Sequence, residues 1–379
     1  MAEPTLTIRA GPRARARILE RGLDPADVAL IPGAAGGPKA LGLTGLDIAL
    51  FGEWLPRAPR VRHLVGASVG AWRFAAACRA DPAQGLRELA RLYAAQRYPP
   101  GSGAALVTRK VREMLAALFD GHDEEILASR DWRVHVLAVR GRGPLSHDAG
   151  LRRAAGFGAA ALANLAGRRH LRHFLERAIF HDPRVLPPFL VPSENGDAPP
   201  SSPGNRRASP IAPMVGFDAF RTHVVALGRE NLREALVASA AIPMVIDAVA
   251  DIPGAPAGLY WDGGLIDYHL HLPYSRVDGL VLYPHFTDHI VPGWLDKALP
   301  WRRARGEWLD NVVLVSPARE YVAKLPFGKL PDRKDFKRFV SDFDGRHSYW
   351  KRAIAESERL GEAFLAFAEK PDPRRVLPL

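Results

Sequence analysis

One serine stands in a sequence context that suits a nucleophile. Gly66, Ser68 and Gly70 match the pattern G-x-S-x-G, in which a strand turns sharply into a helix and the small neighbours let the serine hydroxyl project. An apolar stretch at 61–65 precedes the motif and a helical pattern at 71–80 follows it. The sequence therefore predicts that Ser68 is a nucleophile and that the two glycines form its elbow.

A glycine-rich segment at 33–39 follows another predicted strand. It does not fit the phosphate-binding pattern G-x-x-x-x-G-K-[ST], because Pro38 stands where a glycine is required and Ala40 where Ser or Thr is required. Paired glycines also let backbone N–H groups converge on an oxygen that becomes negative during acyl transfer. We therefore predict that the N–H groups of Gly36 and Gly37 form an oxyanion hole.

A carboxylate follows the short predicted strand 258–261. Asp262 is followed by Gly263 and Gly264, which allow close approach of another backbone segment, although an Asp-Gly turn is also common by itself. The carboxyl ends of parallel strands lie along one edge of a sheet. Asp262 and Ser68 are therefore expected to converge despite their separation in the sequence.

The order of these motifs resembles that of the patatin-like acyl hydrolases, over roughly residues 27–285. The resemblance implies a three-layer α/β/α sandwich with a mainly parallel central sheet. It also implies a serine acyl ester hydrolase, similar to phospholipase A, that uses a Ser68–Asp262 dyad on acyl-ester or lipid substrates without a cofactor. The four matching segments are Gly36-Gly37-Pro38-Lys39, Gly66-Ala67-Ser68-Val69-Gly70, Ser239-Ala240-Ala241-Ile242-Pro243 and Asp262-Gly263-Gly264.

The sequence departs from the family pattern in two places. Ala35 and Ala40 replace glycines at the outer positions of the glycine-rich loop, and residues 265–273 form a longer connection that contains histidines. An alanine keeps its backbone N–H, so the oxyanion hole survives if these positions need no positive φ. Acyl chain length, head group and the effect of the altered loop on catalysis stay open at this point.

Two other functions compete with the dyad. The first is a Ser-His-Asp esterase, because several histidines follow Asp262 in the chain. The second is a catalytically weakened module that binds lipid. No set of residues with the spacing of metal ligands stands out, so no metal is expected. The candidate histidines are His269, His271, His285 and His289.

The elements that must position these residues alternate along the chain. Apolar segments followed by glycine turns and helical patterns predict an α/β fold with a parallel sheet. The expected strands are 27–32, 61–65, 133–139, 223–227, 258–261, 279–283 and 311–315, and the expected helices include 41–51, 71–80, 104–119, 151–179, 229–241 and 346–369.

We expect three parts in the chain: an N-terminal lead-in (1–26), the hydrolase domain (27–316) and a C-terminal helical extension (317–379). Within the domain, prolines and small polar residues predict an irregular insertion at about 183–213. The nearly uncharged stretch 154–167 predicts a buried helix of small residues. The alternative is an interfacial helix that touches lipid.

Composition agrees with an ordinary globular protein. The 379 residues are 47% hydrophobic and 25% charged, and 52 Lys and Arg against 41 Asp and Glu give a formal net charge of +11. This charge leaves two alternatives, which are peripheral contact with an anionic membrane or basic residues spread over a solvated surface. No motif suggests nucleic acid as a partner. A single cysteine, Cys78, excludes an internal disulfide. Without an apolar signal segment, we expect a cytoplasmic protein.

Overall fold

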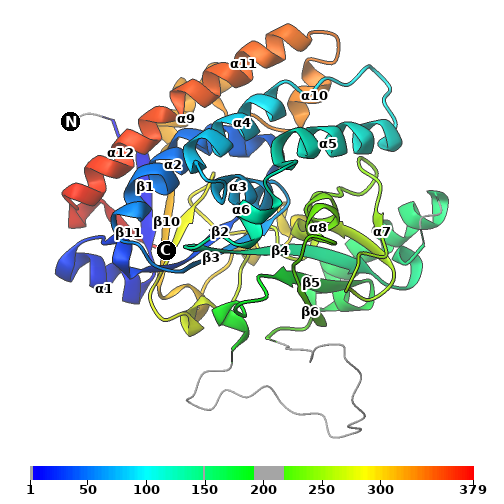
Figure 1. Cartoon of the computed structure of the whole chain (residues 1–379), viewed down its shortest axis with the longest axis horizontal. Helices are drawn as coiled ribbons and strands as arrows, with labels where there is room; N and C mark the ends of the chain where they lie inside the picture. The colour runs from blue at the N-terminus through cyan, green and yellow to red at the C-terminus, as the bar shows by residue number, and fades with distance from the viewer. Residues whose placement is uncertain (1–2, 148–149, 192–216) are drawn as a thin grey trace, which may run out of the picture.

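The computed structural model describes residues 3–147, 150–191 and 217–379. It is an α/β protein built on one mixed, mostly parallel sheet (Figure 1). The strand order is β11-β1-β10-β9-β2-β3-β4-β5-β6, and β8 joins β4 and carries β7. The strands are β1 (Leu6–Ala10), β2 (Val28–Gly33), β3 (Arg62–Ala67), β4 (Trp132–Gly141), β5 (Leu175–His181), β6 (Thr222–Ala226), β7 (Val249–Ala250), β8 (Leu259–Asp262), β9 (Leu280–Pro284), β10 (Val312–Pro317) and β11 (Val376–Pro378).

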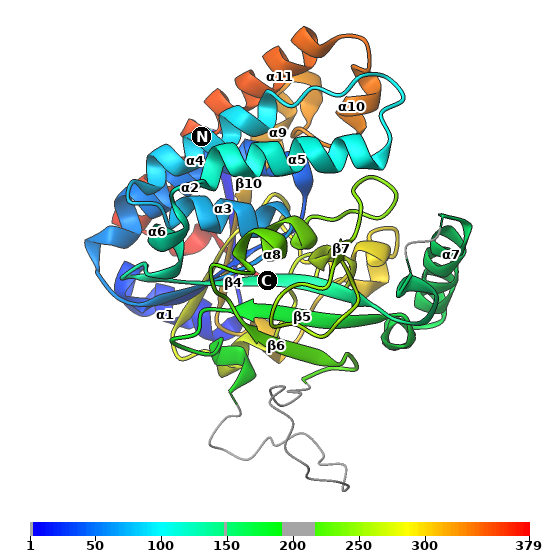
Figure 2. The same ribbon diagram turned by 45° about the vertical axis from the view of Figure 1, so that its right-hand side comes forward.

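Helices lie on both sides of this sheet. Those from α2 to α5, together with α11 and α12, gather on one side, while α1 lies on the other (Figures 1 and 2). This arrangement agrees with the predicted three layers. The helices are α1 (Pro12–Arg21), α2 (Thr44–Ala49), α3 (Val69–Ala77), α4 (Pro82–Ala94), α5 (Ala104–Phe119), α6 (Asp123–Leu127), α7 (Gly150–Ala166), α8 (Leu232–Ser239), α9 (Arg319–Lys324), α10 (Lys334–Arg338), α11 (Phe343–Glu356) and α12 (Glu358–Glu369).

The five central strands, from β10 through β9, β2 and β3 to β4, all run parallel. Every residue of β2 and β10 is buried, because strands covered on both faces have no side that meets water. This explains why their sequences read as continuous apolar runs. The predicted α/β class with a mainly parallel sheet is therefore confirmed.

One predicted helix is partly wrong. The pattern at 151–179 divides into α7 and the strand β5, which pairs antiparallel with β4. The strand is not recognisable in the sequence because Glu176 and Arg177 are charged, and charged residues are not expected in a buried strand. Both are nevertheless buried. Each is neutralised by partners from distant segments: Glu176 by Arg140 at 2.8 Å, and Arg177 by Asp267 at 2.6 Å.

The terminal segments both contribute strands to the sheet. From the segment predicted as a lead-in, β1 pairs antiparallel with β10, and from the segment predicted as a helical extension, β11 pairs parallel with β1. The helical pattern predicted at 346–369 corresponds to two helices, α11 and α12, with Ser357 between them. The end of the chain therefore packs beside its beginning.

The prediction that 154–167 is buried is wrong, although the segment is helical. In α7 only Gly156, Ala160 and Asn164 are buried, which is one narrow stripe at helical spacing. Leu151 and Leu162 are 90% and 69% exposed. The interfacial alternative for this helix stays a prediction.

Two other features bear on the predicted membrane contact and insertion. No helix among the described residues combines the length and apolar character needed to traverse a bilayer. Most of the irregular insertion predicted at 183–213 lies outside the described residues, which break off at 191 and resume at 217.

Candidate active site

Ser68 occupies a strained turn between β3 and α3. Its backbone angles are φ 56° and ψ −132°, a region that residues other than glycine seldom adopt. The flanking glycines are needed for close approach: a Cβ added to Gly66 would lie 2.5 Å from the nitrogen of Ala71, and one added to Gly70 would lie 1.9 Å from the carbonyl oxygen of Gly33. The predicted nucleophile elbow is thus present in the backbone.

Asp262 reaches Ser68 through the register of β4. Strand β3 runs parallel to the first part of β4 and ends where Ala67 faces Leu137, while β8 runs antiparallel to the next part and ends where Asp262 faces Ala138. The carboxyl ends of β3 and β8 therefore meet on one edge of β4. The predicted convergence is confirmed, but its expected cause, two parallel strands, is wrong.

A direct hydrogen bond joins the two side chains. The Ser68 hydroxyl donates to Oδ2 of Asp262 at 2.9 Å, and the backbone N–H of Gly264 donates to Oδ1 at 2.7 Å. Burial raises the pKa of Asp262 to about 6, although these two hydrogen bonds and the charges of Arg333 and Lys297 act in the opposite direction. The carboxylate is therefore a stronger base than an ordinary aspartate.

Ser239, at the end of α8, holds the nucleophile turn in place. Its hydroxyl accepts a hydrogen bond from the N–H of Ser68 at 2.8 Å and donates one to the carbonyl oxygen of Leu137 at 2.6 Å. Two residues later, the carbonyl oxygen of Ala241 accepts from the N–H of Asp262 at 3.0 Å. The segment Ser239–Pro243 therefore positions both members of the pair.

The glycine-rich loop after β2 lies at the same edge. Gly36 and Gly37 both line the pocket beside Ser68, and within the described part of the chain no protein group accepts a hydrogen bond from their N–H groups. Gly37 has φ 57°, and a Cβ on Gly36 would lie 2.5 Å from the Phe286 ring. Both positions thus require glycine, and both N–H groups are available to a ligand.

The alanines that depart from the family pattern are compatible with this loop. Neither Ala35 nor Ala40 is among the described residues with positive φ. The N–H of Ala35 donates to the carbonyl oxygen of Tyr268 at 2.9 Å, which ties the loop to the segment after Asp262. A Cβ on Gly264 would lie 2.7 Å from that of Ala35, and one on Gly263 would lie 2.3 Å from the Leu137 carbonyl oxygen, so the two motifs pack closely.

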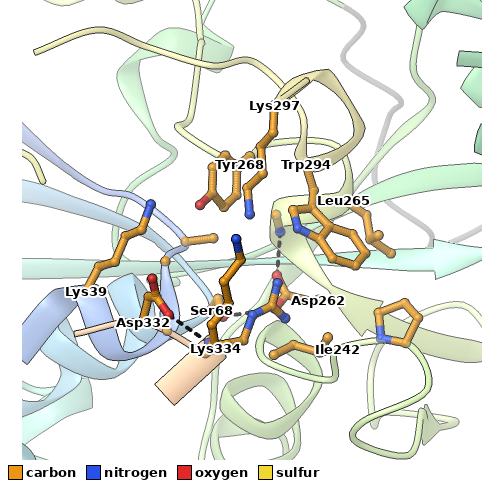
Figure 3. A pocket seen from close by; sticks show the side chains of 16 residues that line it. Lys39, Ser68, Ile242, Asp262, Leu265, Tyr268, Trp294, Lys297, Asp332 and Lys334 are labelled. Atoms are coloured by element: carbon orange, nitrogen blue, oxygen red, sulfur yellow. Dashed lines mark hydrogen bonds between the residues drawn. The ribbon is translucent and has the colours of Figure 1, made fainter. Parts of the chain in front are cut away.

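These residues open onto a cavity of about 330 Å³ (Figure 3). Its wall has an apolar part and a basic part. Lys297 and Arg333 belong to the basic part and were not predicted as site residues, because they lie in irregular segments with no motif. The apolar part is formed by Ile242, Pro243, Leu265 and Trp294, and the basic part by Lys39, Lys297, Arg333 and Lys334.

The candidate histidines lie elsewhere. Across the described ranges, no histidine lines this cavity or hydrogen-bonds to Ser68 or Asp262. His269 accepts from the N–H of Val291 at 3.0 Å. Burial lowers the pKa of His285 to about 3, so this imidazole is neutral. In the same described residues, no three His, Cys, Asp or Glu side chains form a group that could hold a metal ion.

The arrangement can carry out nucleophilic acyl transfer. It supplies a projecting hydroxyl, a carboxylate with raised pKa in direct contact with it, and unpaired N–H donors nearby.

No protein-family model matches the chain, and no curated protein is significantly similar to it in sequence.

Replacing Ser239 tests its positioning role. Ser239→Ala leaves the N–H of Ser68 and the carbonyl of Leu137 without their partner, so we expect a loss of about 1–3 kcal/mol in unfolding free energy. We also expect slower labelling of Ser68 by a fluorophosphonate, because the turn loosens. Urea unfolding and labelling rates measure the two effects.

A matched control is Ser357→Ala. Ser357 is also a fully buried serine whose hydroxyl accepts from one N–H, that of Gly45 at 2.8 Å, and donates to one carbonyl, that of Ile354. This variant should lose similar stability but keep the labelling rate. Equal labelling by both variants would contradict the role of Ser239.

The raised pKa of Asp262 predicts a cost in stability. A folded-state pKa near 6 against about 3.9 in the unfolded chain means that the folded state holds its proton more tightly. The cost is therefore absent below about pH 4 and complete above about pH 6. Asp262→Asn should raise the unfolding free energy at pH 8 by up to about 3 kcal/mol, and by little at pH 4.

Asp218→Asn is the control of opposite sign. Although burial acts against it, the charge of Arg177 lowers the pKa of Asp218, so its carboxylate contributes stability above about pH 4 that the variant should lose. Urea unfolding at both pH values measures each variant. A less stable Asp262→Asn protein at pH 8 would contradict the interpretation.

Proposed function

We propose that the chain is a hydrolase of carboxylic esters that uses a Ser68–Asp262 dyad. The observation that carries this proposal is the direct hydrogen bond of 2.9 Å from the Ser68 hydroxyl to the Asp262 carboxylate, at a strained turn that opens onto a cavity. The resemblance of four motifs to the patatin-like acyl hydrolases supports it independently, and points to acyl esters of the lipid class.

In the first half of the reaction Ser68 attacks the ester carbonyl carbon. Asp262 takes the hydroxyl proton as the C–O bond forms, and the carbonyl oxygen becomes an oxyanion near the N–H groups of Gly36 and Gly37. The intermediate then collapses. The bond to the alcohol breaks, Asp262 returns its proton to the leaving alkoxide, and the acyl group stays on Ser68.

Water completes the reaction. Asp262, again ionised, accepts a proton from a water molecule that attacks the acyl-enzyme carbonyl. Collapse of the second tetrahedral intermediate releases the carboxylic acid and returns the proton to the Ser68 oxygen. Because the same carboxylate serves both halves, its pKa must lie below the working pH yet high enough for efficient proton transfer.

The two alternatives have less support. A Ser-His-Asp esterase would need an imidazole between serine and acid, a place that the direct Ser68–Asp262 contact leaves no room for. A weakened lipid-binding module would follow from a disrupted glycine loop, yet the backbone angles at Ala35 and Ala40 suit alanine. Both observations support an active dyad.

Hydrolysis of p-nitrophenyl esters with acyl chains from C2 to C16 tests this function. Ser68→Ala and Asp262→Asn should each lower kcat on the order of 10³-fold or more, because each removes one half of the dyad. Substitutions of His269, His271, His285 and His289, one at a time, should leave activity in every variant that folds. If one of the histidine variants is inactive while Asp262→Asn works, the dyad is wrong.

The pH dependence gives a second test. Because Asp262 acts as the carboxylate, kcat/KM for a neutral ester should rise through a single ionisation near pH 6 and then stay level. Arg333→Gln should move this midpoint upward, since the positive charge of Arg333 stabilises the carboxylate. Lys337→Gln, which removes an exposed charge outside the cavity from the helix that follows Arg333, should not. A midpoint unmoved by Arg333→Gln would refute the assignment to Asp262.

A further inference from the structure

Positive charge collects around the proposed nucleophile. In Figure 3, Lys39 lies to the left of Ser68 and Lys297 reaches down from above, while Leu265 and Ile242 lie to the right. Across the described ranges, neither Lys39, Lys297 nor Arg333 forms an ion pair or a hydrogen bond through its side chain. Their donors are thus free to bind a ligand.

Aromatic rings support all three of these side chains. The ammonium of Lys297 lies 4.1 Å from the centre of the Tyr268 ring, and the guanidinium of Arg333 lies 5.2 Å from that of Trp294. The ring faces attract cations without occupying their hydrogen-bond donors. The charges are therefore held in place and still presented to the cavity. Lys39 is held similarly, 4.6 Å from the centre of the Phe286 ring.

The three cations are crowded. Lys297 is exposed as a residue, but its ammonium loses water beside the rings, and this loss, together with the charges of Arg333 and Lys39, lowers the pKa of Lys297 to about 7. Of the two acids in the cavity wall, Asp262 belongs to the dyad and Asp332 is paired with Lys329 at 3.1 Å. A bound anion would relieve the repulsion among the cations.

A buried carboxylate fixes the loop that carries Arg333. Asp335 is fully buried and accepts hydrogen bonds from the ammonium of Lys329 at 2.7 Å, from the Trp350 indole at 3.1 Å and from the N–H of Asp332 at 2.8 Å. Three bonds to one carboxylate leave this turn little freedom. The backbone at Arg333 is therefore held in a fixed position at the cavity wall.

Size and polarity limit the ester that fits. One water molecule takes about 30 Å³ in the liquid, so the 330 Å³ cavity has the volume of about eleven water molecules, which suits a small ester. The two halves of an ester diverge from the carbon that Ser68 attacks. The acyl half, an alkyl chain in the proposed substrates, suits the apolar wall of Ile242 and Leu265. The alcohol half therefore extends toward the cations.

We propose that the substrate is a compact ester whose alcohol half carries an anionic group, a carboxylate or a phosphate, bound by Lys297, Arg333 and Lys39. This inference rests on the proposed ester hydrolysis and narrows its substrate class. The bidentate fork of Arg333 suits either anion, and the two ammonium groups add donors on the other sides.

A pair of esters of nearly equal shape tests the charge requirement. The anionic member is 4-acetoxybenzoate and the neutral member is its methyl ester. We expect Lys297→Gln and Arg333→Gln each to lower the ratio of anionic to neutral kcat/KM about tenfold or more, as the loss of a hydrogen bond to a charged group does. Using the ratio cancels the different reactivity of the two leaving groups and any change in the base.

Lys337→Gln is the matched control, because it removes one charge from α10 without touching the cavity. An equal fall of the ratio in this variant would mean that only the general field of a basic protein acts, and would overturn the proposal. Arg333→Lys, which keeps the charge but loses the fork, should restore part of the ratio.

Binding separates this proposal from the proposed function. Calorimetry with Ser68→Ala, which cannot turn the ester over, should show tighter binding of 4-acetoxybenzoate or of 4-acetoxyphenyl phosphate than of the methyl ester. Preference for either anion supports the subsite and identifies its anion. If no ester is hydrolysed but the preference holds, the hydrolase assignment fails and the subsite stands; if neither anion binds better than the neutral ester, the subsite is wrong.

Discussion

The site depends on one edge of β4, where β3 and β8 end at consecutive residues. Ala67 faces Leu137 and Asp262 faces Ala138, so Ser68 and Asp262 meet in the space between two strand ends. A slip of one residue in either register would move a side chain by about 3.3 Å and turn it to the other face. That displacement exceeds what the 2.9 Å contact can absorb. The hydroxyl of Ser239 opposes such a slip, because it bridges the N–H of Ser68 and the carbonyl oxygen of Leu137 in β4.

The contact between Ser68 and Asp262 lowers the stability of the folded state, and packing of the surrounding core offsets this loss. Ser68 holds a positive φ, which costs about 1–3 kcal/mol, and Asp262 is buried with a raised pKa. Both features would relax if the neighbouring elements could shift. They cannot, because every residue of α3 is buried and β3 lies between β2 and β4 in the parallel part of the sheet. The contact between Ser68 and Asp262 is thus stabilised by neighbouring elements, such as α3, β2 and β4, whose residues do not line the cavity.

Much of this framework was predictable from local pattern, and the exceptions share a physical cause. Apolar runs before glycine turns identified β2 and β3, and the motif glycines identified the elbow. β5 was missed because Arg177 is neutralised by Asp267 and Asp218, acids far away in the sequence that turn a charged strand into a buried one. The convergence of Ser68 and Asp262 was predicted correctly for an incorrect reason, since nothing in the local sequence tells that β8 runs antiparallel to β4.

The cations of the cavity explain why motifs alone could not identify a substrate. The dyad and the glycine loop follow strands, where spacing and residue type carry a signal. Lys297 and Arg333 lie in irregular segments. The turn that carries Arg333 is fixed by the hydrogen bonds of Asp335 with Lys329 and Trp350, and these residues form no recognisable sequence pattern. Under the proposed function, the catalytic groups lie at strand ends and the substrate-binding groups lie in the turns packed over them. If the proposed hydrolysis is right, a chain that kept all four motifs but lost the charge of the segment around Arg333 would accept a different ester.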